Sequence, residues 1–589
     1  MQASGPGSSI SGIYDVRAFG ARGDGINLDT PAINKAIDAA SAAGGGTIFF
    51  PAGNYLSVSI HLKSNIALYL SQGATIVAAE TSTTARYDAP EPNPFDHYQD
   101  FGHTHFHNSL IWGESLENVS ILGPGRIWGK GLSRGQSTRP TSFPATAGDY
   151  TTEPDGTTRP FGRRARRGRR NSSRPTTAED LAGGARPSTE DSPTTNRSAF
   201  SEDQNFYRGR GQSRPTTDLG PNQPYPNARD QLAAGIGNKS ISLKNCHNVI
   251  LKDFSILHGG HFGILVTGVD NLTIDNLKID TNRDGMDIDS CRNVRVSNCS
   301  VNSPWDDAIV LKSDYALGYL RPQENTTITN CFVTGGYYEG TLMDGTWKRS
   351  GREYRAARTG RIKLGTESNG GFKNITVSNC VFDCCGGFAL ESVDGGPIED
   401  ITISNISMRD IVNMPIFIRL GNRARGPNSP PAATIRHINI GDIVCSNTAG
   451  RYASVITGIP MRDIEDVKIH DIRIIQQGGG NDFDATSRPT ERETAYPEPS
   501  MFGTSPSYGF YIRHVNGIEM SNIEVTYMKE DRRPPFVLQN VTNADFHNIK
   551  ASHPTDVPMF RLHAVDDFNA RQNLGMQDGH MDHVDDGQF

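Results

Sequence analysis

Long apolar segments are missing from this sequence of 589 residues. A membrane-spanning helix needs about 20 consecutive apolar residues, and no run approaches that length. An excess of positive charge is missing too, because the formal net charge is −7, whereas proteins that bind nucleic acid usually present a basic face. We therefore expect a protein with no membrane span and no nucleic-acid partner.

Cysteines with the spacing of a metal site are also absent. The eight cysteines include no C-x-x-C pair, and no combination with histidine has zinc-site spacing. Cys246, Cys299, Cys331 and Cys380 each follow an asparagine at the same point of a repeated unit. This placement predicts buried packing residues that stack on one another rather than a disulfide framework.

The repeated unit itself covers most of the chain. It consists of Asn or Asp, a short apolar strand, another Asn or Asp and a second short strand, as in HNVILKDFSIL from His247 and DNLTIDNLKID from Asp270. Alternating β-branched residues predict strands, and so short a unit buries its apolar face only by stacking on its neighbours. Coils of about 22 residues with two or three strands are typical of a parallel β-helix. We predict an all-β fold, a right-handed parallel β-helix from about Tyr14 to Ile549, in one domain over residues 1–565.

Three segments depart from the repeat. Asp29, Thr30 and Pro31 precede apolar residues at helical spacing, which predicts a short helix over residues 30–43 that covers the N-terminal end of the solenoid. Residues 133–227 are rich in Pro, Thr, Ser, Gly and Arg without apolar periodicity, which predicts a long, flexible, polar insertion. Residues 566–589 are acidic and are predicted to form an ill-ordered tail.

Aspartates gather in two segments that lie one coil apart. Asp284 lies in TNRDGMDIDS, and Asp306 and Asp307 follow about one coil later in PWDDAIVLKS. Because stacked strands lie roughly 4.8 Å apart, we expect the three carboxylates on one patch. Carboxylates so close cannot all ionise at neutral pH, so at least one pKa rises and leaves a proton to donate. That combination suits hydrolysis of a glycosidic bond; solvated turn aspartates or a calcium site are the alternatives.

The two aspartate segments resemble the paired motifs of glycoside hydrolase family 28, the polygalacturonases and their relatives. The family motifs read N-T-D-G-x-D and D-D-x-x-x-x-K-S, and this chain has N-R-D-G-M-D and D-D-A-I-V-L-K-S. FGARGDG from Phe19 and GRIKLGTESNGG from Gly360 are also similar to bacterial members. The resemblance implies that Asp306 is the general acid and that Asp284 and Asp307 together activate the attacking water, which inverts the anomeric centre.

The chain departs from the family where a substrate carboxylate would bind. Gly360 replaces the histidine of the family's G-H-G turn, and the family's R-I-K tripeptide occurs one coil early, from Arg361 to Lys363. Ala389 and Glu391 stand where that Arg and Lys belong, and a carboxylate there would repel a uronate. The departure predicts a pectic or related acidic glycan other than simple polygalacturonate, and rhamnogalacturonan-type members are the closer comparison.

Nine further side chains are candidates for substrate contact. They lie within a few coils of the aspartates, and a turn or packing role is the alternative for each of the histidines and the tryptophan. The candidates are His258, His261, Trp305, Lys312, Arg361, Lys363, Glu391, Asp394 and Arg419. No metal ligand and no cofactor is predicted.

An inverting glycoside hydrolase acting on a polysaccharide or oligosaccharide is thus the predicted function. The alternatives are a polysaccharide lyase that uses calcium and a non-catalytic glycan-binding β-helix. A polymeric substrate cannot enter a cell, yet Met1 leads into small polar residues rather than an apolar signal segment. We expect that an export signal has been replaced at Met1 and that the protein is secreted or periplasmic.

Overall fold

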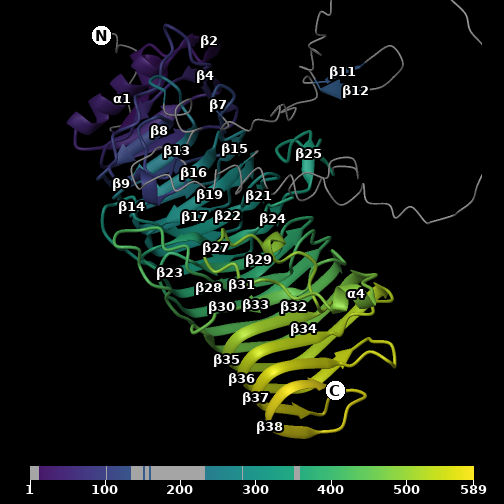
Figure 1. The fold of residues 1–589 in the computed structure, drawn as a ribbon. Helices are drawn as coiled ribbons and strands as arrows, with labels where there is room; N and C mark the ends of the chain where they lie inside the picture. The colour runs from purple at the N-terminus through teal and green to yellow at the C-terminus, as the bar shows by residue number, and fades with distance from the viewer. Residues whose placement is uncertain are drawn as a thin grey trace, which may run out of the picture.

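The computed structural model describes residues 12–100, 102–133, 150–152, 158–160, 233–281, 283–349 and 358–589. Most of these residues form one elongated solenoid of short stacked strands (Figure 1). The predicted parallel β-helix is confirmed, and its coils continue past Ile549 to Arg571. Within the described ranges, no helix is long and apolar enough to cross a lipid bilayer.

Each coil contributes strands to three parallel stacks. The stack that bears the candidate site contains β5 (Ile60–His61), β8 (Ser109–Glu114), β13 (Lys239–Lys244), β16 (Phe262–Thr267), β19 (Asp284–Asp289), β22 (Ile309–Ser313), β27 (Ile362–Ser368), β29 (Phe388–Ser392), β31 (Ile416–Leu420) and β33 (Ser454–Thr457). The second contains β1 (Ile13–Asp15), β3 (Gly46–Phe50), β6 (Ile66–Leu70), β9 (Glu117–Leu122), β14 (His247–Lys252), β17 (Asp270–Asp275), β20 (Arg292–Ser297) and β23 (Gln323–Thr329). The third contains β2 (Asp24–Leu28), β4 (Gly53–Ser57), β7 (Ala74–Ala78), β10 (Arg126–Trp128), β15 (Ser255–Leu257), β18 (Lys278–Asp280), β21 (Ser300–Asn302) and β24 (Phe332–Thr334).

Longer strands continue the second and third stacks without a break toward the C-terminus. They are β28 (Phe372–Asp383), β30 (Ile398–Arg409), β32 (Ile435–Thr448), β34 (Ile464–Gly478), β35 (Phe510–Lys529), β36 (Phe536–Ala551) and β37 (Phe560–Arg571). The last three of these strands also continue the first stack, because the start of β35 pairs with β33. The remaining elements are η1 (Val16–Phe19), α1 (Thr30–Ala42), η2 (Asp96–Tyr98), β11 (Tyr150–Thr152), β12 (Thr158–Pro160), β25 (Tyr337–Glu339), β26 (Lys348–Arg349), α4 (Asp482–Ala485), η4 (Pro499–Phe502) and β38 (Gly579–Gln588).

The asparagines between the strands form a ladder along the outside of the solenoid. Asn271 donates its side-chain amide to Asn248 on the preceding coil at 3.0 Å and accepts from Asn293 on the next at 3.3 Å. All three have φ between 56° and 58°, a left-handed conformation that asparagine adopts more readily than most residues. The repeated Asn therefore fixes both the bend and the spacing of the coils.

We expect Asn271→Ala to lower the thermal melting temperature of the protein. Alanine keeps the left-handed backbone only at a cost of about 1–2 kcal/mol, and it also breaks both ladder bonds. Asn271→Gly is the matched control, because glycine adopts this conformation without strain and loses only the ladder bonds. Thermal unfolding of the three proteins checks the order; equal melting temperatures for the alanine and glycine variants would show that the conformation carries no cost here.

All eight cysteines are buried and free. Cys331 interacts with Cys299 and Cys380, the equivalent residues of the two adjacent coils. The prediction of stacked packing residues is confirmed for Cys299, Cys331 and Cys380. Cys246 is buried as well, but it lies at another point of the coil, just before β14 and in register with Val269.

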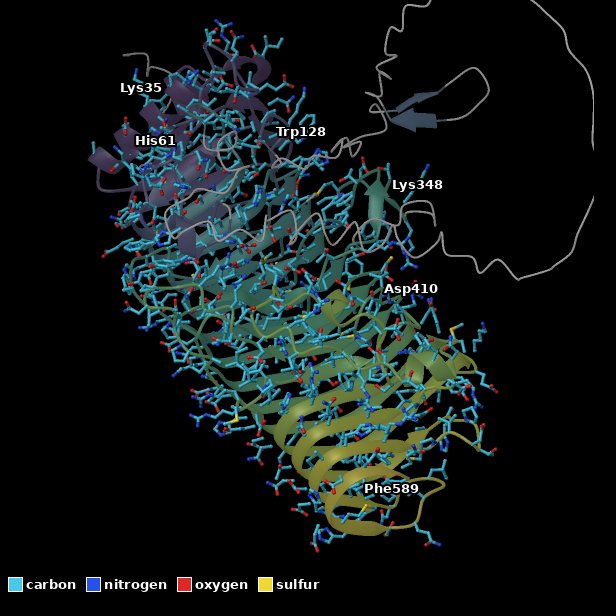
Figure 2. All side chains as sticks on the ribbon, in the orientation of Figure 1. Lys35, His61, Trp128, Lys348, Asp410 and Phe589 are labelled. Carbon is cyan, nitrogen blue, oxygen red and sulfur yellow. The ribbon has the colours of Figure 1, made fainter. Side chains whose placement is uncertain are left out.

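The two ends of the solenoid are covered in different ways. At the N-terminal end α1 packs Ile33 and Ile37 against the core, which confirms the predicted capping helix. At the other end β38 runs antiparallel on β37. The predicted ill-ordered tail over residues 566–589 is therefore wrong, because Phe568 is buried in the core and Phe589 packs against it at the end of the molecule (Figure 2).

The predicted insertion over residues 133–227 lies outside the described residues, apart from 133 and the strands at 150–152 and 158–160. The coils on either side of it are direct neighbours. β13 pairs with β8, β14 with β9 and β15 with β10, all in parallel register. The chain thus resumes the solenoid at the next coil.

We expect the stability of β38 to depend on pH through His583. Hydrogen bonds to Asp566 and then to Asp585 raise the pKa of this imidazole above its usual value of 6.5. A raised pKa stabilises the fold fully below the unfolded value of about 6.5, and this stabilisation is lost as pH rises through the folded value. We expect amide protection of β38 in hydrogen exchange, corrected for intrinsic rates, to fall over that range. His583→Gln should weaken the dependence, and an unchanged profile in this variant would contradict the assignment.

Candidate active site

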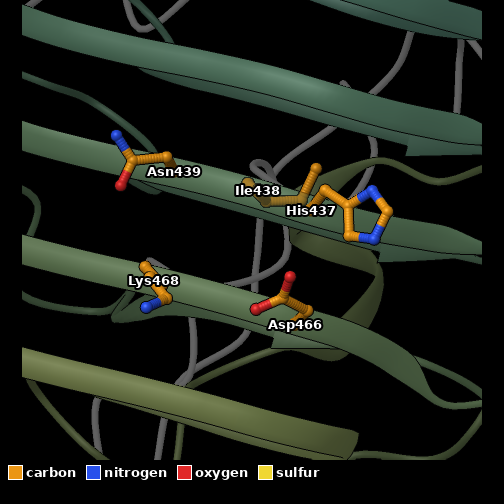
Figure 3. Close-up of a pocket in the computed structure, with 5 residues that line it drawn as sticks. All are labelled: His437, Ile438, Asn439, Asp466 and Lys468. Carbon is orange, nitrogen blue, oxygen red and sulfur yellow. The ribbon is translucent and has the colours of Figure 1, made fainter.

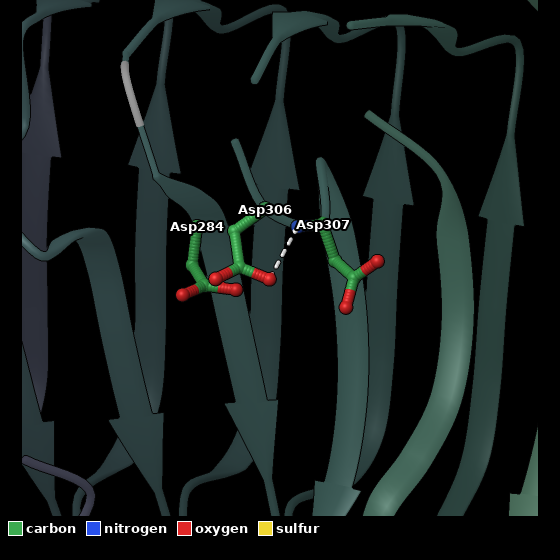
Figure 4. Close-up of side chains that lie close together, drawn as sticks. All are labelled: Asp284, Asp306 and Asp307. Carbon is green, nitrogen blue, oxygen red and sulfur yellow. Dashed lines mark hydrogen bonds between the residues drawn. The ribbon is translucent and has the colours of Figure 1, made fainter. Parts of the chain in front are cut away.

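The three predicted aspartates meet at the N-terminal end of two neighbouring strands. Asp284 begins β19, and Asp306 and Asp307 lie in the turn that precedes β22, where the Gly285 amide donates to the Asp307 carbonyl at 2.9 Å. Carboxylate oxygens of the three residues lie within 4.8 Å of one another (Figure 4). The regular register of the coils therefore brings together carboxylates that are one coil apart in the sequence.

The surroundings of Asp284 favour the protonated form of its carboxyl group. It is buried, and burial together with the negative charges of Asp306 and Asp287 raises its pKa well above the usual value. Like charges within a few ångströms titrate as a unit, so the proton uptake of Asp284 is linked to the charge of Asp306.

The surroundings of Asp307 favour its ionised form. Arg361 donates from Nε to its Oδ1 at 2.6 Å, and Lys363 Nζ lies 2.9 Å from its Oδ2. Burial acts to raise the pKa of Asp307, but these two cations outweigh it and lower the pKa. Arg361 and Lys363 were predicted to contact substrate, but in the structure both bind the Asp307 carboxylate.

Asp306 is paired with Arg283, a residue that the sequence analysis did not single out. Arg283 Nη2 donates to Asp306 Oδ2 at 2.8 Å. The hydroxyl of Ser303 lies 2.5 Å from the Arg283 carbonyl oxygen and 3.0 Å from that of Asp306, which ties the two turns together. The signal was available in the motif itself, since this chain reads N-R-D-G where the family reads N-T-D-G.

Gly360, which replaces the family's histidine, lies directly beneath Asp306. Its amide donates to the Asp306 carbonyl at 2.8 Å, and its φ is +39°. A Cβ there would lie 2.2 Å from backbone atoms of Thr334 and Gly335. No side chain fits at this position, so the turn excludes a histidine on steric grounds.

Lys312 lies in a buried ion-pair network behind the aspartates. Its ammonium group lies 2.8 Å from Glu367 and 3.8 Å from Asp287. His103 also contacts Asp287 at 3.0 Å, and Arg425 contacts Glu367 at 2.6 Å. Sequence reasoning missed His103 and Arg425, because loops distant in the sequence bring them to this strand, and it also missed Glu367, which lies on the neighbouring strand β27.

Glu391 does not face the outside of the molecule. Its side chain is fully buried, 3.8 Å from Lys363 and 3.2 Å from the Thr366 hydroxyl. Burial raises its pKa to about 7. The expected repulsion between Glu391 and a uronate therefore has no structural basis in this conformation.

Asp394 and Arg419 are also committed to internal partners. Arg423 donates from Nε to Asp394 at 2.9 Å. Arg419 donates to the carbonyl oxygens of Gly458 and Glu491 at 3.0 and 2.9 Å. Both candidate residues thus bind loops of the protein itself and do not form an open binding surface.

The two histidines lie beside the aspartates on the N-terminal side. His258 is a left-handed turn residue with φ 53°. His261 precedes Phe262, which pairs with Asp284 on the next coil. Burial, assisted by the charge of Arg283, lowers the pKa of His261 well below 6.5, so its ring is neutral. Trp305 is half-buried next to Asp306.

A shallow hollow elsewhere on the surface is unrelated to this cluster (Figure 3). It lies between β32 and β34 in the second stack, and none of the candidate residues contributes to it. Its lining residues are His437, Ile438, Asn439, Asp466 and Lys468.

Two sequence families match parts of the chain. Residues 13–89 match the family described as rhamnogalacturonase A/epimerase, pectate lyase-like, and residues 233–423 match the right handed beta helix region. The second match confirms the predicted hand of the solenoid.

An exo-poly-alpha-D-galacturonosidase of Dickeya chrysanthemi is 22% identical over 485 residues, which cover 78% of this chain and 66% of that protein. The structure of a family 28 exopolygalacturonase from Yersinia enterocolitica aligns over 92% of this chain and 78% of its own, at 18% identity and a TM-score of 0.55. The chain resembles family 28 exopolygalacturonases. The predicted resemblance is confirmed, and these family 28 relatives belong to the enzyme class that the aspartate motifs indicated.

A second family 28 likeness supports the same fold. The exopolygalacturonase of Thermotoga maritima aligns over 88% of this chain and 92% of its own, with a TM-score of 0.50 and 17% identity. A mannuronan C5-epimerase of Azotobacter vinelandii is 46% identical over 71 residues, which are 12% of this chain and 5% of that protein. The chain therefore spans about two thirds of the galacturonosidase and a small part of the epimerase.

Proposed function

We propose that this protein is a glycoside hydrolase that cleaves a pectic or related acidic polysaccharide by inversion. The observation that carries the proposal is that three carboxylates lie within 4.8 Å of one another in surroundings that raise the pKa of Asp284 and lower the pKa of Asp307. An acid beside an ionised base is what cleavage of a glycosidic bond requires. The relationship to exopolygalacturonases supports the pectic substrate.

Asp306 is the general acid in this proposal, because its side chain is the most exposed of the three. It gives its proton to the leaving oxygen as the glycosidic C–O bond breaks. When Asp306 carries the proton, Asp284 is ionised and orients a water together with Asp307. The water oxygen bonds to the anomeric carbon from the opposite face, and Asp307 accepts its proton.

A lyase that uses calcium is the second candidate, since three carboxylates within 4.8 Å could hold a metal ion. Arg283 already contacts Asp306, and Arg361 and Lys363 already contact Asp307. A divalent cation at the cluster would meet these three positive charges at close range, and Coulomb repulsion disfavours this. The charge arrangement thus favours hydrolysis.

Incubation with defined polysaccharides tests the proposal. Polygalacturonate, rhamnogalacturonan, alginate and a neutral arabinan serve as substrates, with product analysis by chromatography and by nuclear magnetic resonance. We expect saturated products from an acidic pectic glycan, formed first with the inverted anomeric configuration. Unsaturated products lost upon chelation would establish the lyase, and binding without cleavage would establish a non-catalytic solenoid. The polygalacturonate arm decides whether the predicted exclusion of that substrate holds.

We also infer that the protein acts outside the cytoplasm, either secreted or periplasmic. A polysaccharide of this class is too large to enter a cell, so the enzyme meets it only after export. Fractionation of the source organism, with antibody detection, checks this location.

A further inference from the structure

The cations around the three aspartates differ sharply in their exposure. Exposed fractions of the side chains are 2% for Arg361, 3% for Lys363 and 7% for Lys312, but 29% for Arg283. The three buried cations are each engaged by a carboxylate of the protein. Of these four cations, Arg283 has the most exposed side chain and can contact a ligand from solvent.

The position of Arg283 is fixed next to the reacting group. Its Nη2 contacts Asp306, whose own side chain is 15% exposed. Ser303 holds the backbone of both residues. A guanidinium group carries five donors in a planar fork, so pairing with Asp306 leaves donors free to meet a second carboxylate in the same plane. A ligand that approaches Asp306 from solvent meets the two side chains together.

We propose that Arg283 binds the carboxylate of an acidic sugar seated beside Asp306 and sets the preference for charged over esterified sugars. The inference rests on the proposed function and names the substrate group that the same site recognises. Arginine binds carboxylates through paired, charge-assisted hydrogen bonds. Arg361 and Lys363 cannot take this role, because their side chains are only 2% and 3% exposed and so offer a ligand almost no surface.

Binding measurements test Arg283 without relying on turnover. The background is Asp284→Asn, whose amide mimics the neutral carboxyl and prevents cleavage during the experiment. Isothermal calorimetry with trigalacturonate and with its methyl ester gives two affinities for each protein. We expect Arg283→Gln to weaken binding of trigalacturonate about 10-fold to 100-fold and binding of the ester less than about 3-fold. Arg283→Lys keeps the charge without the fork and should lie between.

The matched control is Arg292→Gln, which removes a half-exposed arginine paired with Glu324 on the outside of the solenoid. It should leave both affinities unchanged. The proposal is overturned if Arg283→Gln weakens both ligands equally, if it weakens neither, or if the parent protein binds trigalacturonate no better than the ester. If the Asp284→Asn protein binds trigalacturonate better than the ester, but the wild-type protein cleaves no polysaccharide, the hydrolase proposal is refuted. The role proposed for Arg283 is then unaffected.

Discussion

Asp306→Asn should reduce turnover about 100-fold to 10,000-fold while leaving the fold and substrate binding nearly unchanged. The amide has almost the shape of the carboxyl but no acidic proton to give to the leaving oxygen. Its oxygen can still accept from Arg283, so the local contacts survive. Initial rates on the substrate found in the polysaccharide screen, with circular dichroism and calorimetry, check all three expectations.

Asp253→Asn is the control for this experiment. Asp253 is an exposed turn residue between β14 and β15, and it accepts a hydrogen bond from Asn276. The control should keep full activity. If Asp306→Asn retained more than about a tenth of the wild-type rate, its role as general acid would be refuted.

Arg361→Gln should move the acid limb of the pH–rate profile to higher pH. Arg361 and Lys363 together hold the pKa of Asp307 below its usual value against the effect of burial. Without Arg361, burial is opposed by Lys363 alone, and Asp307 takes up a proton at a higher pH. The base is then lost over a range in which the wild-type enzyme is active, which the pH dependence of kcat/KM measures.

The same substitution also changes stability with a definite sign. A lowered pKa in the folded state stabilises the protein above the unfolded pKa of about 3.9, and this stabilisation is lost as pH falls through the folded value. Arg361→Gln should therefore destabilise the protein at neutral pH more than at pH 3. Arg361→Lys, which keeps the charge, should restore part of the profile, and Arg436→Gln, in an exposed ion pair with Glu399, should change nothing. An unshifted acid limb would show that Asp307 is not the base.

The coils, the capping helix and the convergence of Asp284 with Asp306 could be predicted because they depend on local, repeated signals. Alternating apolar residues set the strands, Asn271 and its equivalents set the bends, and a constant coil length turns sequence spacing into spatial proximity. The tail was mispredicted because its acidic composition hid Phe568, Val584 and Phe589, which anchor β38 to the core.

The partners of the aspartates were harder to predict. Arg425 lies 325 residues from Asp100, to which it donates at 2.6 Å, and no periodicity links such positions. Glu391 is covered because Tyr496 reaches across to Thr366 at 2.9 Å, so its burial depends on the path of a non-repeating loop. Sequence alone located the carboxylates, but their charge states depend on cations placed by the fold.

The antiparallel strand β38 changes what the edge of the last parallel coil can bind. A parallel solenoid ends on a strand whose free edge matches the edge of any similar coil, so such an end can add further chains one after another. In this protein β38 reverses direction on β37 and presents alternating histidine and aspartate side chains, among them His580, Asp582 and His583. An incoming parallel coil would find the wrong polarity and unmatched charges. β38 thereby covers the edge of β37 and disfavours the addition of a further parallel coil at that edge.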